Sequence, residues 1–387
     1  MLNHKLTGDQ LEYQKLARDF AERELAPNAH KYDASGAFPK DILEKAFESG
    51  LLNVMVPESL GGLGLTVFDA AIIFEEMAAG DSGIAGSAEA SSFAQQFLIE
   101  FGAQAQLEEF LSPMLETPTL AGFGATGGVK ANRVFFRREG DEFVLSGRHA
   151  AVINGGVADW YVIRAQEDRR ESEARGRAPA STQKESYSYF IVRADDEGLN
   201  FTERAQLLGR KSLVISAARF EEILLPAGSL LGTVGQGQEI YNHCLTKTYP
   251  IMAAGMVGVA AASLQHAIKY AKERTTFGVN IASHQAIAFM LADMAKEIEA
   301  ARLLVYQAAQ LADQGIISTG EAICAKAFAQ DMVMRTTCDA VQIFGGYGFS
   351  REYPVEKLMR DAKVYQLIEN TSENLKVELG RELVMSV

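Results

Sequence analysis

The chain has 387 residues, a length that suits two or three domains of ordinary size. Hydrophobic residues make up 48% of the chain and charged residues 22%, which excludes a disordered, collagen-like or disulfide-framed protein. Its 50 acidic side chains outnumber its 37 basic ones, and the resulting net charge of −13 disfavours nucleic acid as a partner.

Three cysteines (Cys244, Cys324 and Cys338) show neither the spacing of metal ligands nor an even disulfide pattern, so we expect buried structural thiols and no metal site. The first residues lack the basic-then-apolar order of a signal peptide. The uninterrupted apolar runs are all shorter than the roughly 18 residues that suggest a membrane-spanning helix. We therefore expect a cytoplasmic protein that does not enter a membrane.

Residues 1–118 are predicted to form a helical domain. Thr7 and Gln10 have the spacing of a capping box, which satisfies free amides at the start of a helix. Another helix is expected to begin at Phe38-Pro39-Lys40 and to end at Gly50. An amphipathic stretch from Phe68 to Met77 follows.

Residues 119–232 are predicted to form a β domain, barrel-like or a sandwich. The segments 143–145, 160–163 and 189–192 are short and rich in β-branched and aromatic residues. Gly140-Asp141 is typical of a hairpin turn. The charged stretch between Gln166 and Ser188 is expected to be a solvated hairpin loop.

Residues 233–387 return to helical periodicity and are predicted to form a helical bundle. Apolar residues step by three and four from Leu291 to Leu311, as on a long helix with one buried face. Gly255 and Gly258 are too small to fill a core and predict close approach between two helices. The predicted class is therefore α+β, in the order helices, strands, helices.

Four local motifs carry the functional information, and each alone also fits a structural role. They are Arg274-Thr-Thr-Phe-Gly278 with His284-Gln285, Gln342-Ile-Phe-Gly-Gly-Tyr-Gly348, Glu352-Tyr-Pro-Val-Glu-Lys-Leu-Met-Arg-Asp361 and Ile368-Glu369-Asn370-Thr371-Ser372. An arginine at a helix end is often a cap, and glycines after a helix often only end it.

Together, in this order and spacing, the motifs resemble those of the acyl-CoA dehydrogenase superfamily over nearly the whole chain. The turn Val56-Pro57-Glu58…Gly61-Gly62 agrees with this resemblance. It implies a helical N-terminal domain, a β-barrel-like middle domain and a C-terminal four-helix bundle. It also implies FAD-dependent α,β-dehydrogenation of an acyl thioester, carried by CoA or by an acyl-carrier protein, with an electron-transfer flavoprotein as electron acceptor.

The resemblance also assigns roles to individual residues. Glu369 matches the catalytic base, because Glu369-Asn370-Thr371 stands where the family has Glu-Gly-Thr. The alternative base position of some relatives matches Thr248, which cannot serve. The family positions that hold the FAD diphosphate and adenine across a dimer interface match Arg274, Phe277 and Gln285. The opposite wall of that pocket matches Gln342, Gly345 and Gly346. Thr371 also matches a position that contacts the cofactor. A homodimer or a tetramer is therefore implied.

The middle domain departs from the family pattern. The family segment Thr-Glu-Pro-x-Ala-Gly-Ser-Asp aligns with residues 121–128, where Thr126 is the residue that can restore a hydroxyl beside the flavin. The family's Trp-Ile-Thr aligns with Ala151-Val152-Ile153, which places Ile153 at the position that reaches flavin N5. A family arginine at the acyl-carrier end aligns with Tyr249.

These departures leave two alternatives open beside the dehydrogenase. The same fold and base could perform a non-classical carbanion reaction (isomerisation, elimination or a reaction that uses oxygen) on an unusual acyl thioester, with weak or absent FAD. The chain could also be a non-catalytic binding or scaffold protein that has lost its flavin.

Overall fold

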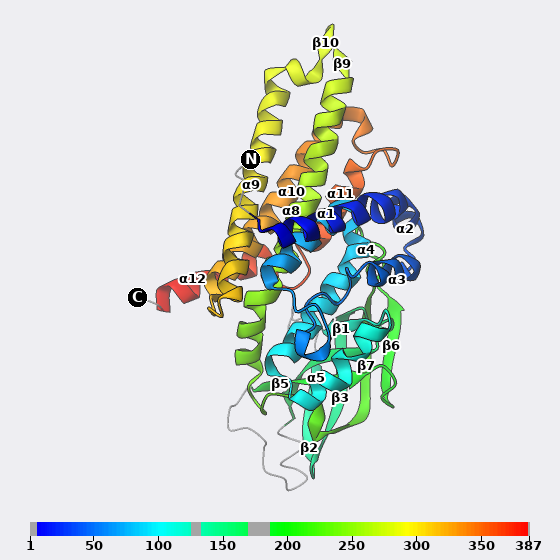
Figure 1. The fold of residues 1–387 in the computed structure, drawn as a ribbon, viewed down its shortest axis with the longest axis vertical. Coiled ribbons are helices and arrows are strands. Elements are labelled where there is room, and N and C mark those ends of the chain that lie inside the picture. The colour runs from blue at the N-terminus through cyan, green and yellow to red at the C-terminus, as the bar shows by residue number, and fades with distance from the viewer. Residues whose placement is uncertain (1–5, 125–132, 169–185, 386–387) are drawn as a thin grey trace.

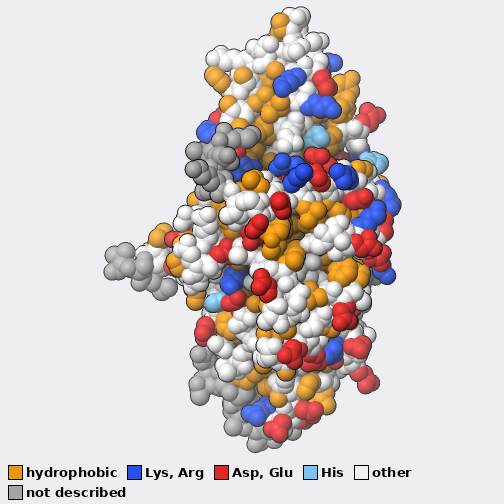
Figure 2. Space-filling model, viewed as in Figure 1, with side chains coloured by type: hydrophobic (Ala, Val, Ile, Leu, Met, Phe, Trp, Pro, Cys, Tyr) orange, Lys and Arg blue, Asp and Glu red, His pale blue; other side chains and the backbone are white. Residues whose placement is uncertain are grey.

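The computed structural model describes residues 6–124, 133–168 and 186–385, and it has three parts in chain order (Figure 1). Helices come first, an eight-stranded sheet follows at one end of the molecule, and long helices complete the chain. The predicted α+β class and the order of its parts are confirmed. On the face shown in Figure 2, Lys and Arg side chains alternate with acidic ones.

The N-terminal part begins with the predicted capping box. Thr7 Oγ1 accepts a hydrogen bond from the amide of Gln10 at 3.2 Å, and Gln10 Oε1 accepts one from the amide of Thr7 at 3.0 Å. The elements are α1 (Gly8–Phe20), η1 (Ala21–Leu25), η2 (Ala26–Asn28), α2 (Ala29–Ser35), α3 (Lys40–Glu48), η3 (Glu58–Leu60), α4 (Val67–Phe101), α5 (Gln104–Leu111) and α6 (Pro113–Glu116).

Helix α4 is much longer than the predicted stretch from Phe68 to Met77. At Asp81 the backbone leaves the helical region (φ −160°, ψ 112°), and the Asp81 carboxylate accepts a hydrogen bond from the amide of Ile84 at 2.8 Å. The second half of α4 is therefore capped as a new helix. Its first turns contain several Gly and Ser residues, which are weak helix formers, and burial against α8 (Gly237–Glu273) overrides their low propensity.

The sheet has the strand order β6-β7-β3-β1-β4-β5-β8, with β2 beside β3 and β4. The strands are β1 (Ala121–Gly124), β2 (Arg133–Glu139), β3 (Glu142–Ile153), β4 (Trp160–Glu167), β5 (Tyr187–Arg193), β6 (Leu199–Arg204), β7 (Ile215–Pro226) and β8 (Leu230–Leu231), with η5 (Ala227–Ser229) before β8. The predicted hairpin turn at Gly140 joins β2 to β3, with a φ of 67° at the glycine. Most of the charged stretch predicted as a loop, residues 169–185, lies outside the described residues.

The C-terminal part is built around α8, which packs against α4, α9 and α10. It contains α8, the hairpin β9 (Thr275–Thr276) and β10 (Val279–Asn280), η6 (Ile281–Ser283), α9 (Gln285–Asp313), α10 (Thr319–Phe344), η7 (Gly345–Tyr347), α11 (Val355–Tyr365) and α12 (Ser372–Met385). The predicted apolar stripe of α9 is buried at Met294, Ile298, Ala301 and Val305. By length and composition α8 could cross a membrane, but 72% of its apolar stretch is buried inside the protein, as in a core helix.

The cysteines differ from the expectation of buried thiols. Cys244 is buried in α8, Cys324 is partly buried and Cys338 is exposed on α10. The expectation is therefore correct only for Cys244. Among the residues that the structure describes, no group of His, Cys, Asp and Glu side chains is arranged to hold a metal ion.

The predicted close approach of two helices occurs between α4 and α8. A methyl group added at Gly258 would lie 2.0 Å from the carbonyl oxygen of Glu75 on α4. One added at Gly255 would lie 2.4 Å from the hydroxyl of Tyr365. Both glycines are therefore required by the spacing of the surrounding elements.

We expect Gly258→Ala to lower the free energy of unfolding by about 1–3 kcal/mol, because α8 must move away from the α4 backbone. Gly380→Ala is the matched control, since no described atom lies within 4 Å of the methyl group it would add to α12. It should leave stability unchanged or raise it by about 1 kcal/mol. Urea denaturation of both variants checks this, and equal midpoints would contradict the assigned role of Gly258.

Candidate active site

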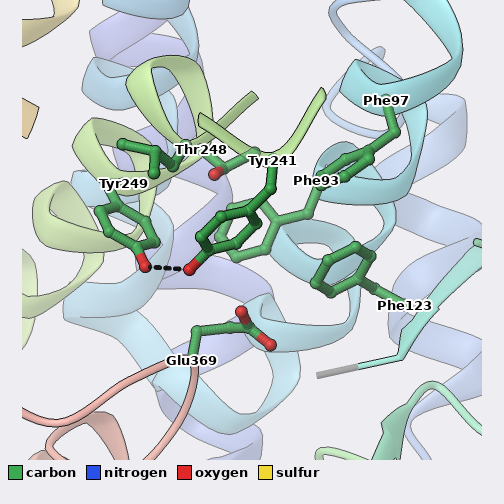
Figure 3. Close-up of a pocket in the computed structure, with 8 residues that line it drawn as sticks. Phe93, Phe97, Phe123, Tyr241, Thr248, Tyr249 and Glu369 are labelled. Carbon is green, nitrogen blue, oxygen red and sulfur yellow. Dashed lines mark hydrogen bonds between the residues drawn. The ribbon is translucent and has the colours of Figure 1, made fainter. Parts of the chain in front are cut away.

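A small cavity of about 10 Å³, roughly the space of one water molecule, lies between α4, β1, α8 and the loop before α12 (Figure 3). It is lined by Phe93, Phe97, Phe123, Tyr241, Leu245, Thr248, Tyr249 and Glu369. Figure 3 shows the Glu369 side chain rising from the loop towards the rings of Tyr241, Phe93 and Phe123. The pocket is thus an aromatic enclosure with one carboxylate.

The backbone of the loop points Glu369 into this pocket. Glu369 has a φ of 53° and Asn370 a φ of 85°, so two successive residues other than glycine are left-handed. Asparagine tolerates this region better than most residues, which explains why it can stand where the family has glycine. The Asn370 side chain donates a hydrogen bond to Glu378 Oε1 at 3.0 Å, and Thr371 Oγ1 accepts one from the amide of Asn374 at 3.4 Å.

Two polar residues of α10 hold the same loop. Lys326 Nζ lies 2.6 Å from the carbonyl oxygen of Glu369, and Gln330 Nε2 lies 3.0 Å from that of Asn370. The sequence analysis missed both residues. The available signal was a Lys and a Gln four residues apart on a helix face that is otherwise apolar.

The hydroxyl groups near Glu369 belong to neutral side chains. Tyr241 and Tyr249 share a hydrogen bond, with 2.7 Å between their oxygens. Burial raises the pKa of Tyr249 and that of Tyr189 well above the usual value. Thr248 also lines the pocket but offers only a hydroxyl, so it cannot replace the carboxylate of Glu369.

The glycines of strand β1 lie directly against large neighbouring side chains. A methyl group at Gly122 would lie 2.3 Å from Cδ1 of the Tyr161 ring, and one at Gly124 would lie 3.0 Å from Nε2 of His149. Burial lowers the pKa of His149 to about 4, so its ring is neutral. These glycines are therefore matched to large neighbours, which sequence comparison with the family pattern could not show.

The predicted phosphate-binding motifs meet at the far end of the bundle. Arg274, at the end of α8, has its guanidinium carbon 6.0 Å from the centre of the Tyr347 ring, which follows Gly345 and Gly346. Gly345 has a φ of 57°, and no described atom lies within 4 Å of a methyl group placed at either glycine. Their backbone is therefore open to a ligand. Phe277, on the β9–β10 hairpin, is 98% exposed.

The other predicted cofactor residues are distributed between the two ends of the molecule. Gln285 is exposed at the start of α9 and Gln342 is exposed in the last turn of α10. Thr371 adjoins Glu369, while Ile153 is buried in β3 opposite Phe123 of β1. Thr126 lies outside the described residues.

One chain therefore does not bring all these residues together. In Figure 1 the β9–β10 hairpin stands at the end of the bundle opposite the sheet, and α12, which follows Glu369, leaves the bundle far from that hairpin.

Comparisons with known proteins agree over the whole chain. Residues 7–117 match the N-terminal domain of acyl-CoA dehydrogenases, and residues 235–384 match the C-terminal domain. The short-chain specific acyl-CoA dehydrogenase of Megasphaera elsdenii is 34% identical over 96% of this chain and 97% of its own length. The chain belongs to the acyl-CoA dehydrogenase family. It is therefore an oxidoreductase that acts on CH–CH groups.

Solved structures of other proteins support the assignment of this chain to the acyl-CoA dehydrogenase family. Butyryl-CoA dehydrogenase from Megasphaera elsdenii has a TM-score of 0.90 at 33% identity, covering 99% of this chain and 100% of that one. A chain from a study of the electron transferring flavoprotein of Acidaminococcus fermentans has a TM-score of 0.90 at 34% identity, covering 99% of each chain.

We expect Asn370→Val to lower the free energy of unfolding by about 1–3 kcal/mol, since a β-branched residue is strained at a φ of 85°. Asn370→Gly keeps the backbone conformation without strain and loses only the side-chain bond to Glu378, so it should be tolerated better. Denaturation midpoints check the order of the two variants. An equal loss of stability in both variants would show that the side chain of Asn370, and not its tolerance of the left-handed backbone, accounts for its role.

Proposed function

We propose that the protein catalyses FAD-dependent α,β-dehydrogenation of an acyl thioester, with Glu369 as the base that removes the α-proton. The observation that supports this is the buried carboxylate directed into an aromatic pocket, at the position that matches the family base. A proton on carbon beside a thioester is weakly acidic. A carboxylate that water cannot solvate is a stronger base for that proton.

The chain's own groups have two further tasks in this proposal. The aromatic side chains of Phe93, Phe123 and Tyr241 exclude water from Glu369, and in this proposal they move apart to admit the acyl group, because the cavity they line has room for about one water molecule. By resemblance to the family, the backbone amide of Glu369 donates to the thioester carbonyl oxygen. That bond stabilises the negative charge that develops there as the proton leaves.

The residues at the hairpin end fit FAD. Arg274 offers an exposed cation, Phe277 an exposed ring for the adenine, and Gly345-Gly346 an open backbone that a diphosphate can approach. Thr371, Gln285 and Gln342 complete the proposed set. When bound, the flavin supplies the acceptor for the hydride that leaves the β-carbon.

We further propose that FAD is shared between subunits of a homodimer or tetramer, because the β9–β10 hairpin of one chain lies far from α12, which begins three residues after Glu369. An electron-transfer flavoprotein is the proposed electron acceptor, in line with the neighbour from the Acidaminococcus fermentans study. The family match gives no support to the alternative carbanion reaction or to a scaffold without activity.

Glu369→Gln should slow exchange of the α-proton of butyryl-CoA by about 10²–10⁴-fold, because the amide keeps the shape of the side chain and removes its basicity. Deuterium incorporation in D₂O, followed by NMR, measures the rate. The FAD content and the denaturation midpoint should stay at the wild-type level. Glu373→Gln, on the exposed surface of α12, is the control and should exchange normally. Wild-type exchange in Glu369→Gln would rule out this base.

The purified protein should contain FAD in proportion to its chains, and Arg274→Met should weaken its affinity for FAD by about tenfold, the loss expected for one charged hydrogen bond. Lys272→Met removes an exposed cation two residues away and is the control. Flavin absorbance after gel filtration and titration of apoprotein with FAD measure both effects. Protein that stays colourless in excess FAD, or equal affinities in the two variants, would contradict the proposed cofactor site.

A further inference from the structure

A buried lysine spans the turn that presents Glu369, and Gln330 assists it by donating to the carbonyl of Asn370. Lys326 is 0% exposed on α10, and its ammonium group donates to three successive carbonyl oxygens. The distances are 3.4 Å to Ile368, 2.6 Å to Glu369 and 3.0 Å to Asn370. An ammonium group has three hydrogens, so this set can use all of its donors.

The geometry of the turn and the position of the ammonium depend on each other. Carbonyl groups of three successive residues point to one place only when the chain curls tightly, as the left-handed conformations of Glu369 and Asn370 require. A buried carbonyl without a partner is costly, and three such groups facing one another would also repel. The ammonium group removes both costs and so favours this conformation over an extended loop.

Carboxylates and an aromatic ring surround the ammonium group of Lys326. Burial lowers the pKa of its ammonium, while the carboxylates of Glu369, Glu378 and Glu89 act in the opposite direction. The ring of Tyr249 lies 4.7 Å from Nζ and adds a favourable contact for the cation. The charged form of Lys326 in turn favours the ionised form of Glu369.

We propose that Lys326 is the positioning residue of the catalytic base: its ammonium fixes the backbone of residues 368–370 so that the Glu369 carboxylate faces the acyl α-carbon. Lys326 is fully buried and its donors are directed at the carbonyl groups of the turn, so in this proposal it acts through Glu369. The inference rests on the proposed role of Glu369 and adds the group that makes that role possible.

Lys326→Met tests the proposal, because methionine keeps the length of the side chain and removes its charge and donors. The maximal rate of α-proton exchange should fall about tenfold or more, with little change in KM for butyryl-CoA, since the acyl pocket itself is unchanged. The exchange rate should begin to rise at a higher pH than in the wild-type protein, because loss of a nearby positive charge disfavours the ionised, reactive form of Glu369. Backbone amides in residues 366–371 should exchange hydrogen faster than in the wild-type protein.

Two further variants separate positioning from general stability. Met332→Ala creates a cavity in the buried face of the same helix and removes none of the hydrogen bonds described for residues 368–370, so it should lower stability without moving the pH profile. Lys326→Gln keeps a donor but no charge. This variant should retain part of the protection of residues 366–371 against hydrogen exchange and still show the displaced pH profile. It replaces Lys326→Met in the test if that variant does not fold.

The outcomes are distinct. A displaced pH profile and a loosened turn in the Lys326 variants, both absent in Met332→Ala, support the proposal. An unmoved pH profile in the Lys326 variants, unchanged protection of residues 366–371, or the same changes in Met332→Ala would overturn it. If wild-type protein exchanges no α-proton, the proposed function fails, and the hydrogen-exchange measurement still decides whether Lys326 holds the turn.

Discussion

The contact between α4 and α8 is the constraint on which the site depends. Near Gly258 the two helices are as close as backbones allow, because a methyl group there would overlap the carbonyl of Glu75. Elsewhere along the same pair, Phe93 and Phe97 of α4 face Tyr241 and other aromatic residues of α8 across the cavity. Small residues in one region and rings in another let a single helix pair form both a tight core and an enclosed pocket.

A buried ionic network sets where the loop that carries Glu369 begins. Lys357 of α11 bonds to Asp81 at the kink of α4 at 2.8 Å and to Asp361 at 2.6 Å. Asp361 also accepts from the amide of Arg210, whose guanidinium pairs with Glu89 at 2.5 Å. Such pairs add little net stability over apolar packing, but loss of one member leaves a buried charge. The network therefore fixes α11, and the chain that leaves α11 leads directly to Glu369.

Much of the fold could be predicted from the sequence, because periodicity and turn residues act locally. The apolar stripe of α9 and the Gly140 turn are such cases. The length of α4 could not be predicted, since the Gly and Ser residues after Asp81 are weak helix formers that are held in the helix by packing against α8. Glu369 was identified by a motif, whereas Lys326 was not, because a lysine within a helix does not indicate which distant loop its ammonium will meet.

Phe277 is 98% exposed on the β9–β10 hairpin, so nearly all of its ring faces solvent in one chain. Burial of that ring contributes nothing to the folding of one chain, so any free energy it supplies is released only when another surface covers it. That contribution then follows the law of mass action, and dilution removes it while the rest of the core is untouched. In the proposed homodimer or tetramer, burial of this ring would stabilise the assembly and not the separate chain.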